Sequence, residues 1–120
     1  MNIYLAGPMR GYPQFNFPAF FKAAELLKEE GHTVFNPAAK DVEKHGDKIW
    51  KKSKGSLKEA EKKGFSLRAA LGADLAWICA KADAVAMLPG WKKSKGATAE
   101  HATAEALGLE IIYLSKEFIK

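Results

Sequence analysis

The chain has 120 residues, a single cysteine and a formal net charge of +5 at pH 7. This length favours one domain with one core over residues 1–120, and a lone cysteine, which cannot form an internal disulfide bond, fits a reducing compartment. The first residues lack the basic region of a signal peptide and no apolar run is long enough to span a bilayer, so we expect a cytoplasmic protein without membrane contact.

The positive charge is concentrated in one lysine-rich stretch. Between Lys40 and Lys63 the chain has nine lysines and five acidic residues, with Trp50 as the only aromatic residue. Lysines mixed with acids are typical of a solvated face, whereas nucleic-acid surfaces interleave basic and aromatic side chains. The charge pattern therefore disfavours a nucleic-acid partner.

The first third of the chain predicts a β-α-β unit. Residues 2–6 form a β-rich run that ends at Gly7, and Asn16 is placed to cap a helix that runs to Glu30 and stops at Gly31. Residues 33–35 give a second short strand. A right-handed crossover makes these two strands neighbouring and parallel.

Residues 38–64 have weak periodicity with breaks at glycines, and they predict an insertion of short, mobile helices. The rest of the chain predicts, in order, a helix over 66–82, a buried strand over 84–88, a helix over 97–107 ended by Gly108, and a strand over 110–114. The whole pattern predicts a doubly wound parallel α/β sheet of the flavodoxin or Rossmann-like kind, with four strands in the order 2-1-3-4.

Two unusual loops, residues 7–12 and 89–96, follow the first and third strands, where this fold binds ligands. The run Ser94-Lys95-Gly96 precedes a helix and predicts an anion site, because backbone N–H groups and the positive end of the helix point there. Arg10 in the facing loop is suited to hold a phosphate or carboxylate bidentately. The plainer interpretation of residues 94–96 is a flexible turn, and that of Arg10 is a surface arginine. Neither loop has the glycine pattern of a nucleoside triphosphate or NAD redox site, so no cofactor is expected.

Two acids occupy positions that helical periodicity turns inward. Glu100 falls on the stripe of Ala104 and Leu107 in the predicted first turn, where the helix dipole favours its anion, as suits a nucleophile or charge stabiliser. Asp74 lies at the edge of the apolar arc of the helix over 66–82. Taken singly, Glu100 is explained as an ordinary acid in the first turn of a helix, and Asp74 as an acceptor of hydrogen bonds from a neighbouring helix end. Two acids that flank the same strand indicate paired carboxylates.

Other side chains receive simpler assignments. Cys79 is predicted to lie in the core, and His101 is predicted to pair with Glu105 on the surface. The three histidines share no metal-ligand spacing, so no metal site is expected. Three aromatic side chains near the two loops are candidates for stacking on a base: Tyr12, Phe15 and Trp91. Phe15 equally fits a hydrophobic contact at the helix entry.

Three motifs follow one another along the chain. They are Tyr4-Leu5-Ala6-Gly7-Pro8-Met9-Arg10-Gly11, then Ala73-Asp74-Leu75 leading through Ala82-Asp83 into the third strand, and then Ser94-x-Gly96-x-x-x-Glu100. Together they resemble the nucleoside 2-deoxyribosyltransferase-like superfamily, and within it a short branch that is frequent in phages and prophages. The resemblance covers most of the chain apart from the lysine-rich insertion.

The resemblance implies a role for several of these residues. Glu100 would attack C1′ of a sugar to give a glycosyl-enzyme, Asp74 would contact the sugar or base and assist protonation of the leaving group, and Tyr4 would orient the nucleophile. The residues expected to contact the substrate and its phosphate are Gly7, Arg10, Trp91, Ser94 and Gly96. The resemblance also implies a homo-oligomer, either a dimer or a tetramer.

The expected ligand follows from Ser94. In the superfamily, transferases that act on free nucleosides carry an aspartate at this position, whereas the related 2′-deoxynucleoside 5′-monophosphate N-glycosidases carry a serine that binds the 5′-phosphate. The expected function is therefore hydrolysis of the base–sugar bond of a (deoxy)nucleoside 5′-monophosphate through Glu100. Three alternatives stay open: base exchange by a nucleoside 2-deoxyribosyltransferase, nucleotide binding without turnover, and hydrolysis of an NAD-like dinucleotide.

Overall fold

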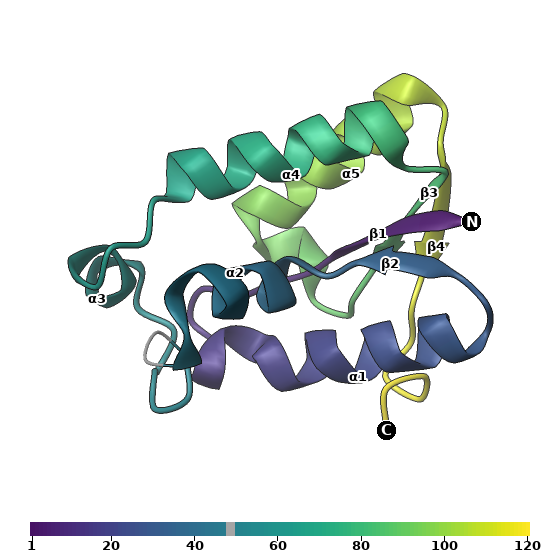
Figure 1. The fold of residues 1–120 in the computed structure, drawn as a ribbon. Coiled ribbons are helices and arrows are strands. Elements are labelled where there is room, and N and C mark those ends of the chain that lie inside the picture. The colour runs from purple at the N-terminus through teal and green to yellow at the C-terminus, as the bar shows by residue number, and fades with distance from the viewer. Residues whose placement is uncertain (48–49) are drawn as a thin grey trace.

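The computed structural model describes residues 1–47 and 50–120. Its centre is a four-stranded parallel sheet made of β1 (Asn2–Ala6), β2 (Thr33–Phe35), β3 (Ala84–Met87) and β4 (Glu110–Tyr113), as Figure 1 shows. The strand order is β2-β1-β3-β4, so the predicted α/β fold and the predicted order are confirmed. In the register, Tyr4 of β1 lies beside Phe35 of β2 and Val85 of β3.

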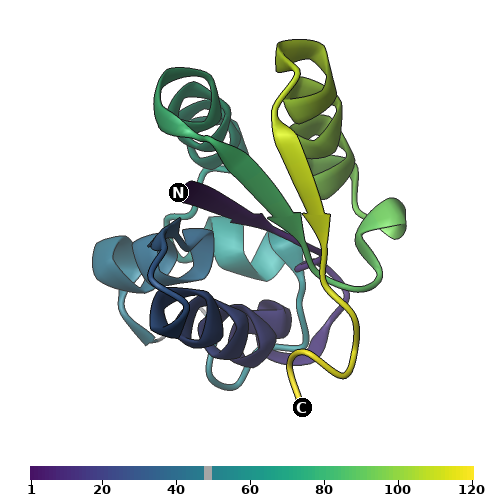
Figure 2. The same cartoon turned by 90° about the vertical axis from the view of Figure 1, so that its right-hand side faces the viewer.

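Helices cover both faces of the sheet. Figure 2 shows α4 (Leu67–Lys81) and α5 (Lys95–Leu107) on one side and α1 (Phe17–Glu29) on the other. Successive strand residues point to opposite faces, so Ile3 and Leu5 pack with α1, while Tyr4 and Ala6 pack toward α4 and α5. Within the described residues, no helix is both long and apolar enough to cross a membrane.

The start of α5 differs from the prediction. The helix begins at Lys95, two residues early, and the side chain of Ser94 caps it by accepting a 3.1 Å hydrogen bond from the backbone N–H of Ala97. Glu100 therefore lies in the second turn instead of the first. It is buried, as is Ala104, but Leu107 at the end of the predicted stripe is 48% exposed, so that part of the prediction was wrong. Gly108 ends the helix with a φ of 69°.

The predicted burial of Cys79 was also wrong, because this side chain is exposed. The helix α4 packs onto the sheet through Ile78, which is buried, and the next residue is turned about 100° away around the helix axis. The apolar character of α4 extends nearly all round it, so periodicity alone did not identify the side that faces the sheet.

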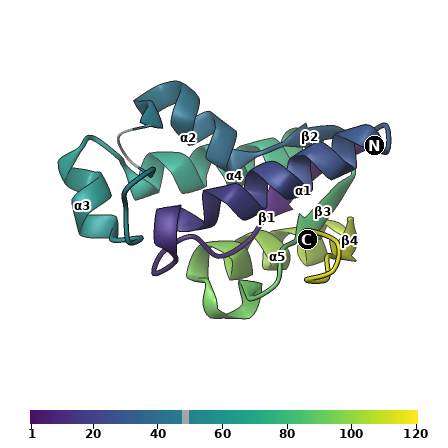
Figure 3. The same cartoon turned by 90° about the horizontal axis from the view of Figure 1, so that it is seen from below.

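The predicted insertion contains two short helices, α2 (Pro37–His45) and α3 (Leu57–Lys62). Figures 1 and 3 place them at the end of the sheet toward which the strands run. The three predicted glycine breaks, Gly46, Gly55 and Gly64, all have positive φ. Residues 48–49 of the insertion lie outside the described residues, and the mobility expected of the segment stays a prediction.

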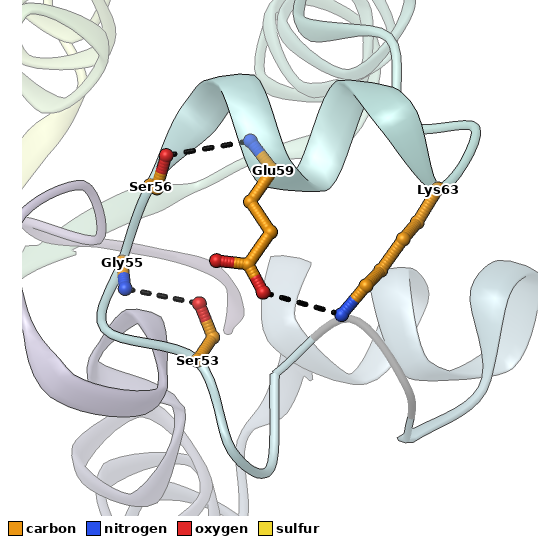
Figure 4. Close-up of polar contacts among 5 residues, drawn as sticks. All are labelled: Ser53, Gly55, Ser56, Glu59 and Lys63. Carbon is orange, nitrogen blue, oxygen red and sulfur yellow. Dashed lines mark hydrogen bonds and ion pairs between the residues drawn. The ribbon is translucent and has the colours of Figure 1, made fainter.

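Backbone hydrogen bonds attach the insertion to the loop after β1. The N–H of Gly11 donates to the carbonyl of Gly55 at 2.9 Å, and the N–H of Gln14 donates to the carbonyl of Ser53 at 2.8 Å. The approach is so close that a Cβ on Gly55 would lie 2.5 Å from the carbonyl oxygen of Tyr12. Figure 4 shows the local supports: Gly55 N–H donates to Ser53 Oγ, the Glu59 N–H donates to Ser56 Oγ, and Lys63 pairs with Glu59.

Candidate active site

A cavity of about 110 Å³ opens at the carboxyl edge of the sheet, between the α4 and α5 side and the α1 side with its insertion. It is lined by Tyr4, Asp74 and Glu100, the three residues with implied catalytic roles. Four of the five residues expected at the substrate or its phosphate also line it: Gly7, Arg10, Ser94 and Gly96. The fold thus brings residues from β1, α4, α5 and two loops to one space.

The shortest polar contact in this space joins Tyr4 and Glu100. The Tyr4 hydroxyl donates a hydrogen bond of 2.5 Å to Oε2 of Glu100. Tyr4 is fully buried, its ring stacked on Phe35 at 5.4 Å and packed near Trp77 at 6.3 Å between centroids. These neighbours fix the ring, so the hydroxyl is held in place against the carboxyl group.

The two predicted acids are both harder to ionise than usual. Burial raises the pKa of Glu100 to about 8; the Tyr4 hydrogen bond acts against this and the charge of Asp74 adds to it. Burial likewise raises the pKa of Asp74 to about 6, with the Tyr4 hydroxyl opposing by favouring the anion. The pKa of Tyr4 is raised by burial and then by the negative charges of both acids.

The net shift in the pKa of Glu100 is upward, opposite to the direction expected from the helix dipole. The dipole acts over the first turn of a helix, and α5 has no acid there. Glu100 lies further along and is only 6% exposed, so the cost of desolvating its charge is the larger effect.

Asp41 of α2 is a third acid on the cavity wall, and sequence reasoning did not find it. Burial raises its pKa to about 7; the charge of Asp74 adds to this and Lys44 opposes it. The available signal was the N-cap: Asn36 accepts from the Ala38 N–H at 3.0 Å and starts α2 beside the end of β2. Which side of α2 would face the cavity depends on tertiary packing that the weak periodicity of the insertion does not encode.

The opposite end of the cavity is suited to an anion. The first turn of α5 leaves the N–H groups of Lys95 and Gly96 outside the helix's own hydrogen bonds, and a Cβ built on Gly96 meets no atom within 4 Å. Ser94 accepts the capping hydrogen bond with an oxygen lone pair, which does not use its own O–H as a donor. Gly7 has a packing reason to be glycine, because a Cβ there would lie 2.7 Å from Cβ of Leu88.

Trp91 does not line the cavity. Its ring stacks on His101, with centroids 4.2 Å apart, and His101 Nε2 lies 2.7 Å from the hydroxyl of Tyr113. The predicted pairing of His101 with Glu105 is present at 3.3 Å, but the His101 side chain is only 12% exposed because the aromatic rings cover it. Trp91 thus belongs to an aromatic cluster beside β4, away from the position expected for a base.

Of the other two aromatic candidates, Phe15 lines the cavity and Tyr12 does not. Gln14, Phe15 and Asn16 all have positive φ, between 53° and 63°, which is uncommon for three consecutive residues that are not glycine. Asn16 precedes α1 as predicted, but its side chain caps no helix N–H; its amide donates instead to the Pro8 carbonyl at 3.0 Å. This strained turn directs Phe15 into the wall of the site.

Over residues 1–47 and 50–120, no group of three or more His, Cys, Asp or Glu side chains is arranged to hold a metal ion. The cavity itself brings together three carboxyl groups, one buried tyrosine and the N-terminus of α5.

The sequence profile of the DUF4406 family, described as a domain of unknown function, matches residues 1–113. The chain belongs to the DUF4406 family. The match includes all four strands of the DUF4406 domain and every residue of its cavity. Neither the curated proteins nor the solved structures gave a match.

Proposed function

We propose that this protein is an N-glycosidase that hydrolyses the base–sugar bond of a (deoxy)nucleoside 5′-monophosphate. The observation that carries the proposal is one cavity lined by the buried Tyr4–Glu100 pair, by Asp74 and by the N-terminus of α5. The resemblance to the nucleoside 2-deoxyribosyltransferase-like superfamily supports the same residues on separate grounds.

In the proposed reaction, the carboxylate of Glu100 attacks C1′ of the sugar as the C1′–N bond breaks, and water then hydrolyses the glycosyl-enzyme ester. The Tyr4 hydroxyl holds one carboxylate oxygen, which leaves the other oxygen of Glu100 for the attack. Asp74 lies beside both of them and acts on the sugar or on the leaving base.

The phosphate specificity is proposed from the α5 end of the cavity. Ser94, the N–H of Gly96 and the guanidinium of Arg10 supply donors, and the positive end of the helix favours an anion. Lys92, Lys93 and Lys95 are exposed around this end and add positive charge. A carboxylate in place of Ser94 would repel a phosphate.

The test is to incubate the protein with a panel of nucleoside and deoxynucleoside 5′-monophosphates and the matching free nucleosides. Release of free base is measured by chromatography. We expect release from at least one monophosphate and its loss in Glu100→Gln, which keeps the volume and an acceptor for Tyr4. Glu105→Gln, an exposed acid on the same helix, is the matched control and should retain activity. Release that needs a second added base would indicate transfer. Tight nucleotide binding without release of any base would contradict the proposal.

A further inference from the structure

Asp41 lines both the cavity and a second hollow. A groove of about 530 Å³ runs between α2 and α4, and Asp41, Phe65, Ala70 and Asp74 line both spaces. The remaining wall on this side is apolar, formed by Leu57, Leu67 and Leu71. Figure 3 shows α2 and α5 on opposite sides of β1, so the lining residues from α2 lie away from Ser94 and Gly96 at the start of α5.

The proposed substrate must occupy the cavity in one direction. If the phosphate binds at the N-terminus of α5 and C1′ faces Glu100, the base extends from C1′ away from the phosphate, since the two groups leave the sugar ring on opposite sides of its ring oxygen. The base then enters the apolar wall of α2, α3 and α4. The charge of Asp74 acts on Asp41 on one side and on Tyr4 and Glu100 on the other, so Asp74 lies between Asp41 and the Tyr4–Glu100 pair.

The charged surroundings of Asp41 differ from those of Asp74. Asp41 shares the lining of the cavity with Tyr4, Arg10, Asp74 and Glu100. On its own helix, the charged or titratable neighbours are Lys40, Glu43, Lys44 and His45. Lys44 alone of these lowers the pKa of Asp41, and burial and the charge of Asp74 outweigh it, giving a pKa of about 7. Asp74 has the Tyr4 hydroxyl beside it and a pKa of about 6, so Asp74 ionises before Asp41. Glu100 has a pKa of about 8, so the form that reacts, with Glu100 ionised and Asp41 protonated, is a minority of the molecules near pH 7.

We propose, on the basis of the proposed function, that Asp41 protonates the leaving base while Asp74 stays ionised beside the sugar. In the first step the Glu100 carboxylate forms the ester bond to C1′, the electron pair of the C1′–N bond passes to the base, and the Asp41 proton neutralises the base. In the second step a water molecule attacks C1′ from the side that the base has left, Asp41 takes the proton of the water, and the ester bond to Glu100 breaks. The products are free base and sugar 5-phosphate, and Asp41 is protonated again.

The inference is tested with two substrates that differ in their need for an acid. One is the nucleotide of the panel that the wild type cleaves fastest. The other is 4-nitrophenyl 2-deoxyribofuranoside 5-phosphate, whose leaving group departs as a stable anion. Asp41→Asn should lower base release from the nucleotide about 100-fold or more, the usual contribution of a general acid, and change 4-nitrophenolate formation, measured in the first turnover, less than about threefold.

Two variants serve as comparisons. Asp74→Asn should slow both substrates, because an acid beside the sugar acts whatever the leaving group is. Asp47→Asn, an exposed acid just beyond α2 that pairs with Lys51, should leave both rates unchanged. A loss in Asp41→Asn that is equal for the two substrates, or selective loss in Asp74→Asn instead, would overturn the assignment of Asp41 alone. A wild type that releases no base would overturn this assignment and the proposed function together.

Discussion

Tyr4 and Glu100 form a buried hydrogen bond of 2.5 Å across 96 positions of sequence, from the middle of β1 to the second turn of α5. The bond joins a strand to a helix that covers it, so the position of the carboxyl group depends on correct packing of the sheet face. The same bond lowers the pKa of Glu100 against the effect of burial.

Tyr4→Phe should therefore raise the pKa of Glu100 above its value of about 8 and leave a buried acceptor without its donor. We expect a loss of about 1–3 kcal/mol in the free energy of unfolding, measured by urea denaturation. Carboxyl ¹³C NMR titration of Glu100 would measure the shift in pKa. An unchanged titration midpoint would contradict the role given to this bond.

The stability of the protein should fall as pH rises from about 5 to about 8. Folded-state pKa values of about 8 for Glu100, 7 for Asp41 and 6 for Asp74 all exceed the values of unfolded carboxyl groups, near 4. The folded state thus retains protons that the unfolded chain releases. The stability these protons contribute is fully present below about pH 4 and is lost as pH rises through the folded values.

Glu100→Gln cannot lose a proton, so its thermal midpoint should exceed that of the wild type at pH 8.5, by the equivalent of about 2 kcal/mol or more, and should match it at pH 5. Scanning calorimetry at the two pH values makes the comparison, with Glu105→Gln as the exposed control. A difference between Glu100→Gln and the wild type that does not depend on pH would show that burial does not control this carboxyl group.

The sheet order and the inward position of Glu100 could be predicted from sequence because strand runs and helical spacing are local signals. The start of α5 could not be predicted, because glycine at position 96 favours a loop. The cap formed by Ser94 nevertheless includes Gly96 in the helix. Asp41 was missed for a different reason. Its place in the cavity depends on how the insertion folds back onto the β1 loop, which is set by backbone hydrogen bonds distant in sequence.

Gly55→Ala should detach the insertion from the site. Both Gly55 and Gly64 have positive φ, but a Cβ on Gly55 would overlap the backbone of Gly11 and Tyr12, whereas one on Gly64 meets no atom within 4 Å. Gly64→Ala should lower the free energy of unfolding by about 1–2 kcal/mol, the cost of positive φ in a residue with a Cβ. Gly55→Ala should lower the free energy of unfolding by more than this, and trypsin should cleave it faster within the lysine-rich insertion. Equal cleavage rates in the two variants would contradict the attachment.

Gly96→Ala separates stability from phosphate binding. The residue lies in the first turn of α5 with open space where a Cβ would stand, so alanine should leave the protein as stable as the wild type or more so. The methyl group would nonetheless occupy space beside the N–H proposed to hold the phosphate. We expect KM for the monophosphate to rise about tenfold, equivalent to about 1.4 kcal/mol, with little change for Gly72→Ala on α4. An unchanged KM would remove this N–H from the phosphate site.

Ser94→Asp tests the ligand class directly. Aspartate caps a helix as well as serine does, so α5 and the free energy of unfolding should be little affected. The added carboxylate would face the 5′-phosphate at close range and repel it, so kcat/KM for the monophosphate should fall at least about tenfold while that for the matching free nucleoside stays the same or rises. Ser56→Asp, the same change at the cap of α3, controls for the capping position. If Ser94→Asp leaves monophosphate turnover unchanged, the phosphate does not bind at the N-terminus of α5, and the direction proposed for the substrate in the cavity is wrong.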